Sequence, residues 1–214
     1  MKLKYWITSG FQIFLIVVAA SFLYGLLITV QNSYMDWNDL WVLLPIYQLL
    51  FGGMMQLAQT TGVYKLNLNL ALAFGSTRNE ALLGLQLFRL IPTLCNTALI
   101  CVLQAVAGEN AIFTPLTALP ISLGIGLAGG ALGTVIGIVY ARFGRLATVL
   151  TVLIIVALGI TGGVLAVMSS EPQWLQSLVS HMGFSWLVFV IGLILYGAAM
   201  IPEHRTVWKY SVRM

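Results

Sequence analysis

Long apolar runs alternate with short polar segments along the 214 residues of the chain. Each run has roughly the 20 residues that an α-helix needs to cross about 30 Å of hydrocarbon. The runs lack the alternation over about 10 residues that is typical of strands in a membrane barrel. We therefore predict an all-α integral membrane protein with one transmembrane domain over residues 1–214 and six spans, at about 10–30, 40–62, 81–107, 116–140, 146–168 and 184–201.

The composition agrees with this pattern. Hydrophobic residues make up 60% of the chain and charged residues 7%, whereas soluble domains carry about 25% charged residues. A core of this size cannot hide so much apolar surface, so we expect the lipid bilayer to be the solvent. The net charge of +4 does not indicate a nucleic-acid partner, because the basic residues are scattered between apolar runs.

The charges between the runs predict the orientation. The first run, from Phe11 to Val30, is longer than the core of a signal peptide, so we expect it to be an uncleaved span. If the N-terminus is cytoplasmic, the C-terminus is too, and Asp36, Asp39, Glu109 and Glu171 fall in the outer segments. The cytoplasmic segments then carry nine of the basic residues, as the positive-inside rule demands: Lys2, Lys4, Lys65, Arg78, Arg142, Arg145, Arg205, Lys209 and Arg213.

Catalytic motifs are missing from the sequence. It contains no phosphate-binding loop of the form G-x-x-x-x-G-K-[ST], no H-E-x-x-H and no G-x-S-x-G. Its two histidines, His181 and His204, fall on opposite sides of the predicted membrane and cannot share a metal ion. The acidic residues all fall in predicted loops, which disfavours a proton-driven carrier. We therefore predict no enzyme activity, no catalytic residue and no metal site.

Glycines recur in the fourth predicted span at helical spacing. Gly129, Gly133 and Gly137 are four residues apart and share one helix face, and Gly126 and Gly130 form a second pair. Glycines at this spacing let another helix approach closely. We predict a packing seam, with a hinge between helices as the alternative.

Polar side chains also occur inside the apolar runs. Gln48, Gln56 and Gln59 fall within one broad stripe of the second predicted span, which must face protein or a wet cavity. Bonds between helices and the lining of a substrate path are both consistent with that stripe. Arg89 is the one cation inside an apolar run, and we expect it to snorkel to the inner interface or to pair with a glutamine or a carbonyl.

A compact polar segment interrupts the stretch LALAFGSTRNEALLG, residues 70–84. The preceding residues predict a short helix at the cytoplasmic interface that ends at Gly75, a favourable C-terminal capping residue. Thr77 is then the predicted N-cap of the next helix, with Glu80 placed to complete a capping box. The segment predicts a helix–turn–helix joint, although a simple turn is an equally simple interpretation.

The residues Phe74-Gly75-Ser76-Thr77-Arg78, followed by Gly84, resemble the loop between helices two and three of type 2 ATP-binding-cassette (ABC) permeases, the bacterial relatives of G-type exporters. The six predicted spans and inner termini are similar to that family. So are Met1–Gly10, which match its short amphipathic N-terminal helix, and the outer stretch 171–185, which matches its re-entrant region.

The resemblance implies that residues 66–74 form a cytoplasmic coupling helix that docks on a separate ABC ATPase, present in two copies. ATP and magnesium are then expected in that partner and no cofactor in this chain. A second copy of the chain, or a sister permease, is expected to complete the transporter. The implied coupling residues are Leu66, Leu70, Phe74, Gly75, Thr77, Arg78 and Glu80, and the implied substrate path contains Gln48, Gln56, Gln59 and Thr151.

The expected function is that of a permease subunit in a bacterial cell membrane. It would export an amphipathic or hydrophobic substrate, such as a peptide antibiotic, a lipid or a drug. One alternative is the substrate-capturing membrane subunit of a vitamin importer, which would copurify with its vitamin. The other is a structural or assembly membrane protein, whose loss would leave transport unchanged.

Overall fold

The computed structural model describes residues 3–31, 37–64, 68, 71–72, 75–108, 114–143, 149, 153 and 182–209. This part of the chain is helical apart from short turns, which confirms the predicted all-α fold. Its long helices are α1 (Leu3–Gln31), α2 (Trp37–Val63), α4 (Arg78–Ala107), α5 (Pro115–Phe143) and α8 (Met182–Lys209).

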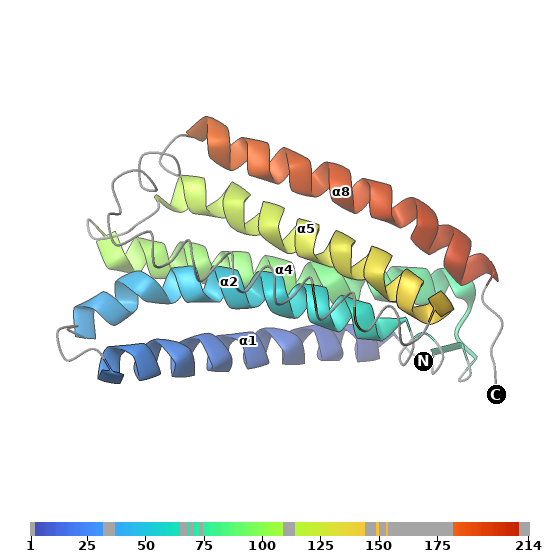
Figure 1. Ribbon diagram of the computed structural model, residues 1–214, viewed down its shortest axis with the longest axis horizontal. Helices are drawn as coiled ribbons and strands as arrows, with labels where there is room; N and C mark the ends of the chain where they lie inside the picture. The colour runs from blue at the N-terminus through green and yellow to red at the C-terminus, as the bar shows by residue number, and fades with distance from the viewer. Residues whose placement is uncertain are drawn as a thin grey trace.

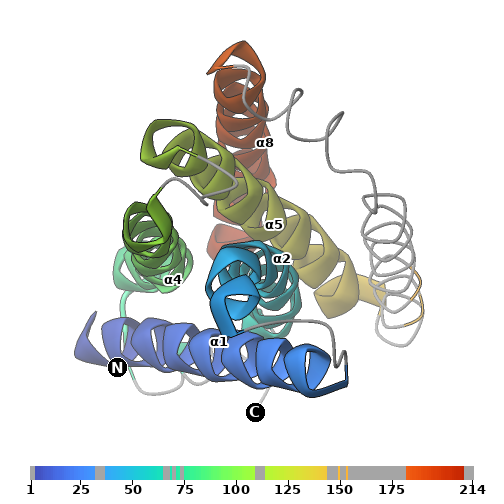
Figure 2. The same cartoon turned by 90° about the vertical axis from the view of Figure 1, so that its left-hand side faces the viewer.

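The five helices extend along the long axis of the molecule (Figure 1), and α1 crosses the others obliquely (Figure 2). Viewed along that axis, α1 and α8 lie on opposite sides of the bundle, with α2, α4 and α5 between them (Figure 2). α5 contacts α2, α4 and α8, and 67% of its most apolar stretch is buried, against 22% for α1 and for α8. α5 is therefore the central helix, whereas α1 and α8 present apolar side chains outward, as helices in lipid do.

Four of these helices, α1, α4, α5 and α8, are long and apolar enough to cross a membrane. α2 is also long, with 27 residues, and carries glutamines and threonines among its apolar side chains. α5 ends at one end of the bundle and α8 begins at the opposite end (Figure 1). The predicted span 146–168 lies in the intervening segment and, apart from residues 149 and 153, outside the described residues. A multi-pass membrane protein is supported, and the number six and the orientation stay predictions.

The predicted separate N-terminal helix is wrong. α1 is one continuous helix from Leu3 to Gln31, so residues 3–10 are simply its first turns. Gly10 lies inside this helix and faces α4, where an added β-carbon would touch Ile91 and Pro92 at 3.4 Å. Trp6 is 1% exposed and packs in the core, so the start of α1 is held by tertiary contacts rather than lying free on a membrane surface.

The glycine seam predicted in residues 129–137 is confirmed. A β-carbon added at Gly129 or Gly133 would lie 2.8 or 2.6 Å from the carbonyl oxygen of Gly53 or Leu57 in α2. Gly137 faces the end of the same helix. Because α5 has no side chains along this face, the two backbones approach closely and gain dispersion contacts over three turns.

The second glycine pair faces another neighbour. An added β-carbon at Gly126 would meet Thr93 of α4, and one at Gly130 would lie 3.6 Å from Arg89 of α4 and from Gln56 of α2. α5 therefore meets α2 and α4 through two adjacent stripes of small residues. A hinge function for either stripe remains a prediction.

Candidate functional site

The joint between α2 and α4 contains a glycine-capped helix end. Leu68, Ala71 and Leu72 are helical, and Gly75 follows with φ of +80°. The Gly75 N–H donates to the Leu72 carbonyl at 3.1 Å, and the Ser76 N–H donates to the Ala71 carbonyl at 3.0 Å. This pair of bonds satisfies the last carbonyls of a helix and requires a left-handed residue, which glycine adopts without strain. The predicted helix end at Gly75 is confirmed.

The next helix begins with the predicted capping box. Thr77 is the extended N-cap of α4, and its hydroxyl accepts the Glu80 N–H at 3.2 Å. In return the Thr77 N–H donates to the Glu80 carboxylate at 2.9 Å. Two backbone N–H groups at the start of α4 are thereby satisfied. The carboxylate that the resemblance assigns to partner binding therefore also has a structural role inside the joint.

The predicted coupling residues Leu66, Leu70 and Phe74 lie outside the described residues. Two residues of the same stretch, Leu68 and Ala71, are fully buried in a core cluster with side chains of α1, α4 and α8. The described part of the predicted coupling helix is thus packed against the bundle and does not project freely from it.

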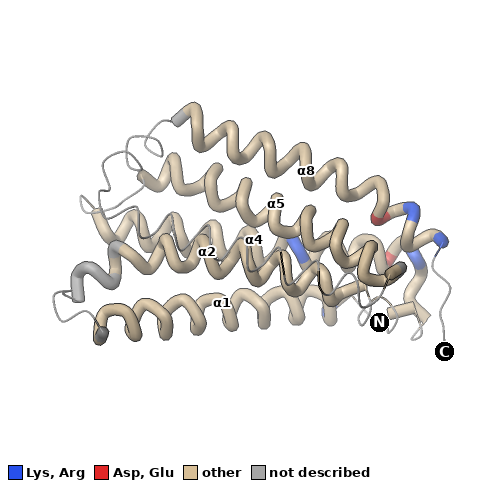
Figure 3. Tube along the Cα trace, in the orientation of Figure 1, with Lys and Arg blue, Asp and Glu red and all other residues tan. Residues whose placement is uncertain are grey.

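Arg78 lies exposed at the first turn of α4, and its guanidinium carbon is 5.7 Å from the ring centroid of Trp208 in α8. Other exposed basic residues gather at the same end of the bundle (Figure 3), namely Lys4, Arg205 and Lys209. Among the side chains that the structure describes, this end carries the exposed positive charge. The clustering agrees with the predicted cytoplasmic side.

Arg89 is buried in an ion pair, so the expected snorkelling is wrong. Arg89 of α4 and Glu203 of α8 are 2% and 0% exposed, and their Nη2 and Oε2 atoms are 2.6 Å apart. Of the two alternative partners, the guanidinium does bond a carbonyl, that of Leu85, but no glutamine of α2. The Gln56 amide donates instead to the Arg89 main-chain carbonyl at 2.8 Å. An arginine inside an apolar bundle needs a counter-charge, and Glu203 supplies it.

Glu203 corrects a further prediction, because we expected every acidic residue in a loop. α8 continues past the predicted span end at 201 as far as Lys209, and this extension turns Glu203 into the bundle. A carboxylate therefore lies within a candidate span, and the argument against a proton-driven carrier loses that premise. Tyr196 lies two helical turns before Glu203, so the two side chains share one face of α8. This spacing is the sequence signal that indicates which way Glu203 faces.

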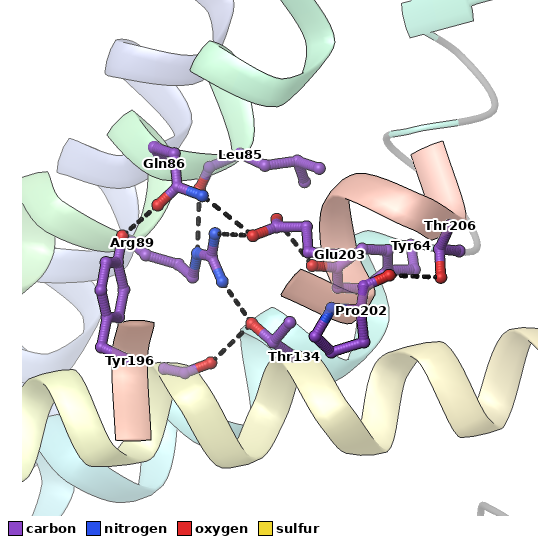
Figure 4. A network of polar contacts seen from close by, with 10 residues as sticks. Tyr64, Leu85, Gln86, Arg89, Thr134, Tyr196, Pro202, Glu203 and Thr206 are labelled. Atoms are coloured by element: carbon purple, nitrogen blue, oxygen red, sulfur yellow. Dashed lines mark hydrogen bonds and ion pairs between the residues drawn. The ribbon is translucent and has the colours of Figure 1, made fainter. Parts of the chain in front are cut away.

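The other two nitrogens of the Arg89 guanidinium also donate hydrogen bonds (Figure 4). Nη1 donates to the Thr134 hydroxyl of α5, and Nε donates to the Leu85 carbonyl at 3.2 Å. The Thr134 hydroxyl in turn donates to the Gly130 carbonyl at 2.8 Å. The guanidinium thereby links α4 to both α5 and α8, and a hydrogen bond at each of its three nitrogens makes the charge tolerable in a low-dielectric interior.

The Glu203 carboxylate accepts two further bonds, one from the end of α2 and one from α4 (Figure 4). Tyr64, one residue beyond α2, donates its hydroxyl to Oε1 at 2.7 Å. Gln86 of α4 donates its amide to Oε2 at 2.9 Å, and its own carbonyl oxygen accepts the Tyr196 hydroxyl of α8. Burial, and next the neighbouring Glu203 charge, raise the pKa of the Tyr64 phenol, so Tyr64 keeps its proton and acts as a donor.

A second polar cluster lies farther from the charged end. Gln48 of α2 is fully buried and accepts the Ser21 hydroxyl of α1. Its side-chain amide donates to the Asn96 side chain of α4, and the Asn96 amide donates to the main-chain carbonyl of Gln48 at 3.3 Å. Gln48 and Gln56, two of the predicted path residues, therefore connect α2 to neighbouring helices. A cavity of about 10 Å³ adjoins Gln56 and Asn96, enough for about one water molecule.

The structure describes three of the four predicted path residues. Gln59 is half-buried in α2, and Thr151 lies outside the described residues. The larger cavity, about 240 Å³, is apolar and lies between α2 and α5, with Leu50, Met54 and Leu132 among its walls. A polar substrate path therefore stays a prediction, whereas an apolar recess is present.

Within the described residues, no three His, Cys, Asp or Glu side chains are grouped as metal ligands would be. The comparisons add no further assignment: no protein-family model, curated protein or solved structure matches the chain.

Proposed function

We propose that the chain is the membrane-spanning permease subunit of an ATP-driven exporter of the ABC class in a bacterial cell membrane. ATP and magnesium are bound by a separate ATPase subunit, present in two copies. A second copy of the chain or a sister permease completes the transporter. The observation that carries the proposal is the doubly capped joint at residues 71–80, with Arg78 exposed beside it at the basic end of the bundle.

The joint suits a coupling role because both of its helix ends are fixed. Gly75 ends one helix and Thr77 begins α4 two residues later, so only Ser76 lies between the two capping residues. A push on this joint would therefore move α4 as a body instead of being absorbed by a flexible linker. Rigid-body movement of packed helices is a common way to switch a membrane protein between states.

The proposed substrate is amphipathic or hydrophobic, such as a peptide antibiotic, a lipid or a drug. The recess of about 240 Å³ between α2 and α5 is apolar, and Gln48 and Gln56 are already bonded to neighbouring helices. Burying an apolar group there gains about 25 cal/mol for each Å² removed from water. A strongly charged substrate would find no counter-charge among the described residues of that recess.

A site-specific photo-crosslinker at Arg78 tests the proposal. The control carries the crosslinker at Thr114, which is exposed at the opposite end of the bundle. The chain is crosslinked in its native membranes, purified and analysed for attached proteins. We expect a soluble protein with a phosphate-binding loop to attach from Arg78 and not from Thr114, and the purified complex to hydrolyse ATP.

Two outcomes contradict the proposal. Equal crosslinking of the same proteins from both positions would show that the basic end has no dedicated partner. A vitamin bound to the purified chain, with no ATPase crosslinked from Arg78, would favour the substrate-capturing subunit of an importer instead.

A further inference from the structure

Both flanks of the joint are attached to one carboxylate of α8. On the α2 side, Tyr64 is the last residue before the segment 65–76, and its hydroxyl binds Glu203 at 2.7 Å. On the α4 side, Gln86 and Arg89 bind the same carboxylate at 2.9 and 2.6 Å (Figure 4). The Glu203 carboxylate therefore binds the two arms of the joint, which are the end of α2 at Tyr64 and the first turns of α4 at Gln86 and Arg89.

The core around the joint reaches the same end of α8. Leu68 and Ala71, from the segment between the two arms, are fully buried in a cluster that also contains Tyr64 and Val207. Elsewhere α8 packs chiefly along α5 and has only slight contact with α4. Among the described residues, the joint is thus connected to α8 by the polar cluster at Glu203 as well as by this apolar cluster.

We propose that Glu203 is a positioning residue that holds both described flanks of the joint, Tyr64 at the end of α2 and the first turns of α4, in register with α8 and transmits their displacement to that helix. The inference deepens the proposed function, on which its second half rests. Water cannot easily replace these bonds because Tyr64, Arg89 and Glu203 are buried, so a displaced joint must either break them or carry α8 along. Three donors on one carboxylate favour the second outcome.

The first arm of the test uses the purified chain in lipid nanodiscs and needs no partner. Tyr64→Phe removes only the hydroxyl that binds Glu203, and Tyr24→Phe, half-exposed on α1, is the matched control. Hydrogen exchange is followed by mass spectrometry in residues 65–76 and in residues 94–107 of α4. We expect exchange in 65–76 to rise about tenfold in Tyr64→Phe, the loss of one charge-assisted bond, and to stay unchanged in 94–107.

A double variant tests Glu203 itself. Glu203→Gln alone leaves the Arg89 charge unpaired and risks unfolding, whereas Arg89→Gln with Glu203→Gln removes both charges together. We expect the double variant to fold and to show the same local increase in exchange at 65–76. Unchanged exchange there, or a uniform increase along the whole chain, would overturn the positioning role.

The second arm adds the ATPase that copurifies with the chain, together with ATP and vanadate. In the wild type we expect the nucleotide to change exchange in α8 by several-fold, and in the double variant to leave α8 unchanged while the ATPase still binds. An equal response of α8 in both proteins would overturn transmission through Glu203. If no ATPase copurifies, the proposed function fails, and the first arm still decides whether Glu203 holds the joint.

Discussion

Two contacts of this bundle solve the same problem by different means. α5 meets α2 through Gly129, Gly133 and Gly137, without any charged group, whereas α4 meets α8 at a buried charge pair. In lipid no hydrophobic force drives helices together, so association depends on close backbone packing or on polar bonds. The seam spreads its stabilisation over three turns, and the ion pair concentrates it on two side chains. We therefore expect the α4–α8 contact to be far more sensitive to a single substitution.

The largest expected effect is on the ion pair. Glu203→Leu leaves the Arg89 charge buried without a partner, and we expect a loss of about 3–5 kcal/mol in the free energy of unfolding. Arg89→Met combined with Glu203→Leu should restore most of this stability, because neither charge is then left alone. Unfolding in mild detergent with increasing denaturing detergent measures both. Equal losses in the single and double variants would contradict the assignment of Arg89 and Glu203 as partners.

A smaller loss is expected from filling the glycine seam. Gly133→Val places a β-carbon 2.6 Å from the Leu57 carbonyl oxygen, which is backbone and cannot rotate away. Overpacking of this kind costs about 1–3 kcal/mol. Gly197→Ala on α8 is the control, since nothing lies within 4 Å of its β-carbon position. The midpoint of the same unfolding transition should fall for the first variant and stay level or rise slightly for the second.

The uncharged polar cluster should matter less than either contact. Gln48→Leu removes the side-chain bonds with Ser21 and Asn96 and leaves the bond from Asn96 to the main-chain carbonyl of residue 48. Single polar bonds between membrane helices average about 0.6 kcal/mol. A loss approaching that of Glu203→Leu would show that the neutral cluster, and not the ion pair, dominates the polar stabilisation of the bundle.

Arg78→Glu should have the smallest effect on stability. Its side chain is exposed and its contact with Trp208 is a cation–π pair at the surface, so the change in unfolding free energy should stay below about 0.5 kcal/mol. We nevertheless expect this variant to lose crosslinking to, or copurification with, the proposed ATPase. Arg205→Glu, at the same basic end, is the control for a general charge effect.

The sequence predicted the features that depend on neighbouring residues. The Gly75 helix end and the box between Thr77 and Glu80 involve bonds that reach no more than five positions along the chain. The glycine seams follow from a repeat of four residues within one helix. In each case the residue type and its spacing already contain the geometry.

The features that the sequence did not predict depend on distant partners. Arg89 and Glu203 are 114 positions apart, and nothing in either local stretch indicates that their helices meet. The predicted sixth span ends at residue 201, so the prediction leaves Glu203 in a loop. In the structure α8 continues for about two further turns and contains Glu203. The resemblance predicts a short amphipathic helix at the N-terminus, whereas these residues are the first turns of α1. The burial of Trp6 against α4 is a tertiary contact that the local sequence does not indicate.

The distance between Arg89 and Glu203 along the chain has a consequence for biogenesis. At synthesis rates of about 5–20 residues per second, Arg89 is made roughly 6–23 s before its counter-charge exists. During that interval Arg89 of the nascent protein has no counter-charge, and Glu203 supplies it only when α8 is made. We therefore expect insertion of the last helix to act as the completion step. A chain truncated before α8 should turn over faster in a pulse-chase experiment than the same truncation carrying Arg89→Leu.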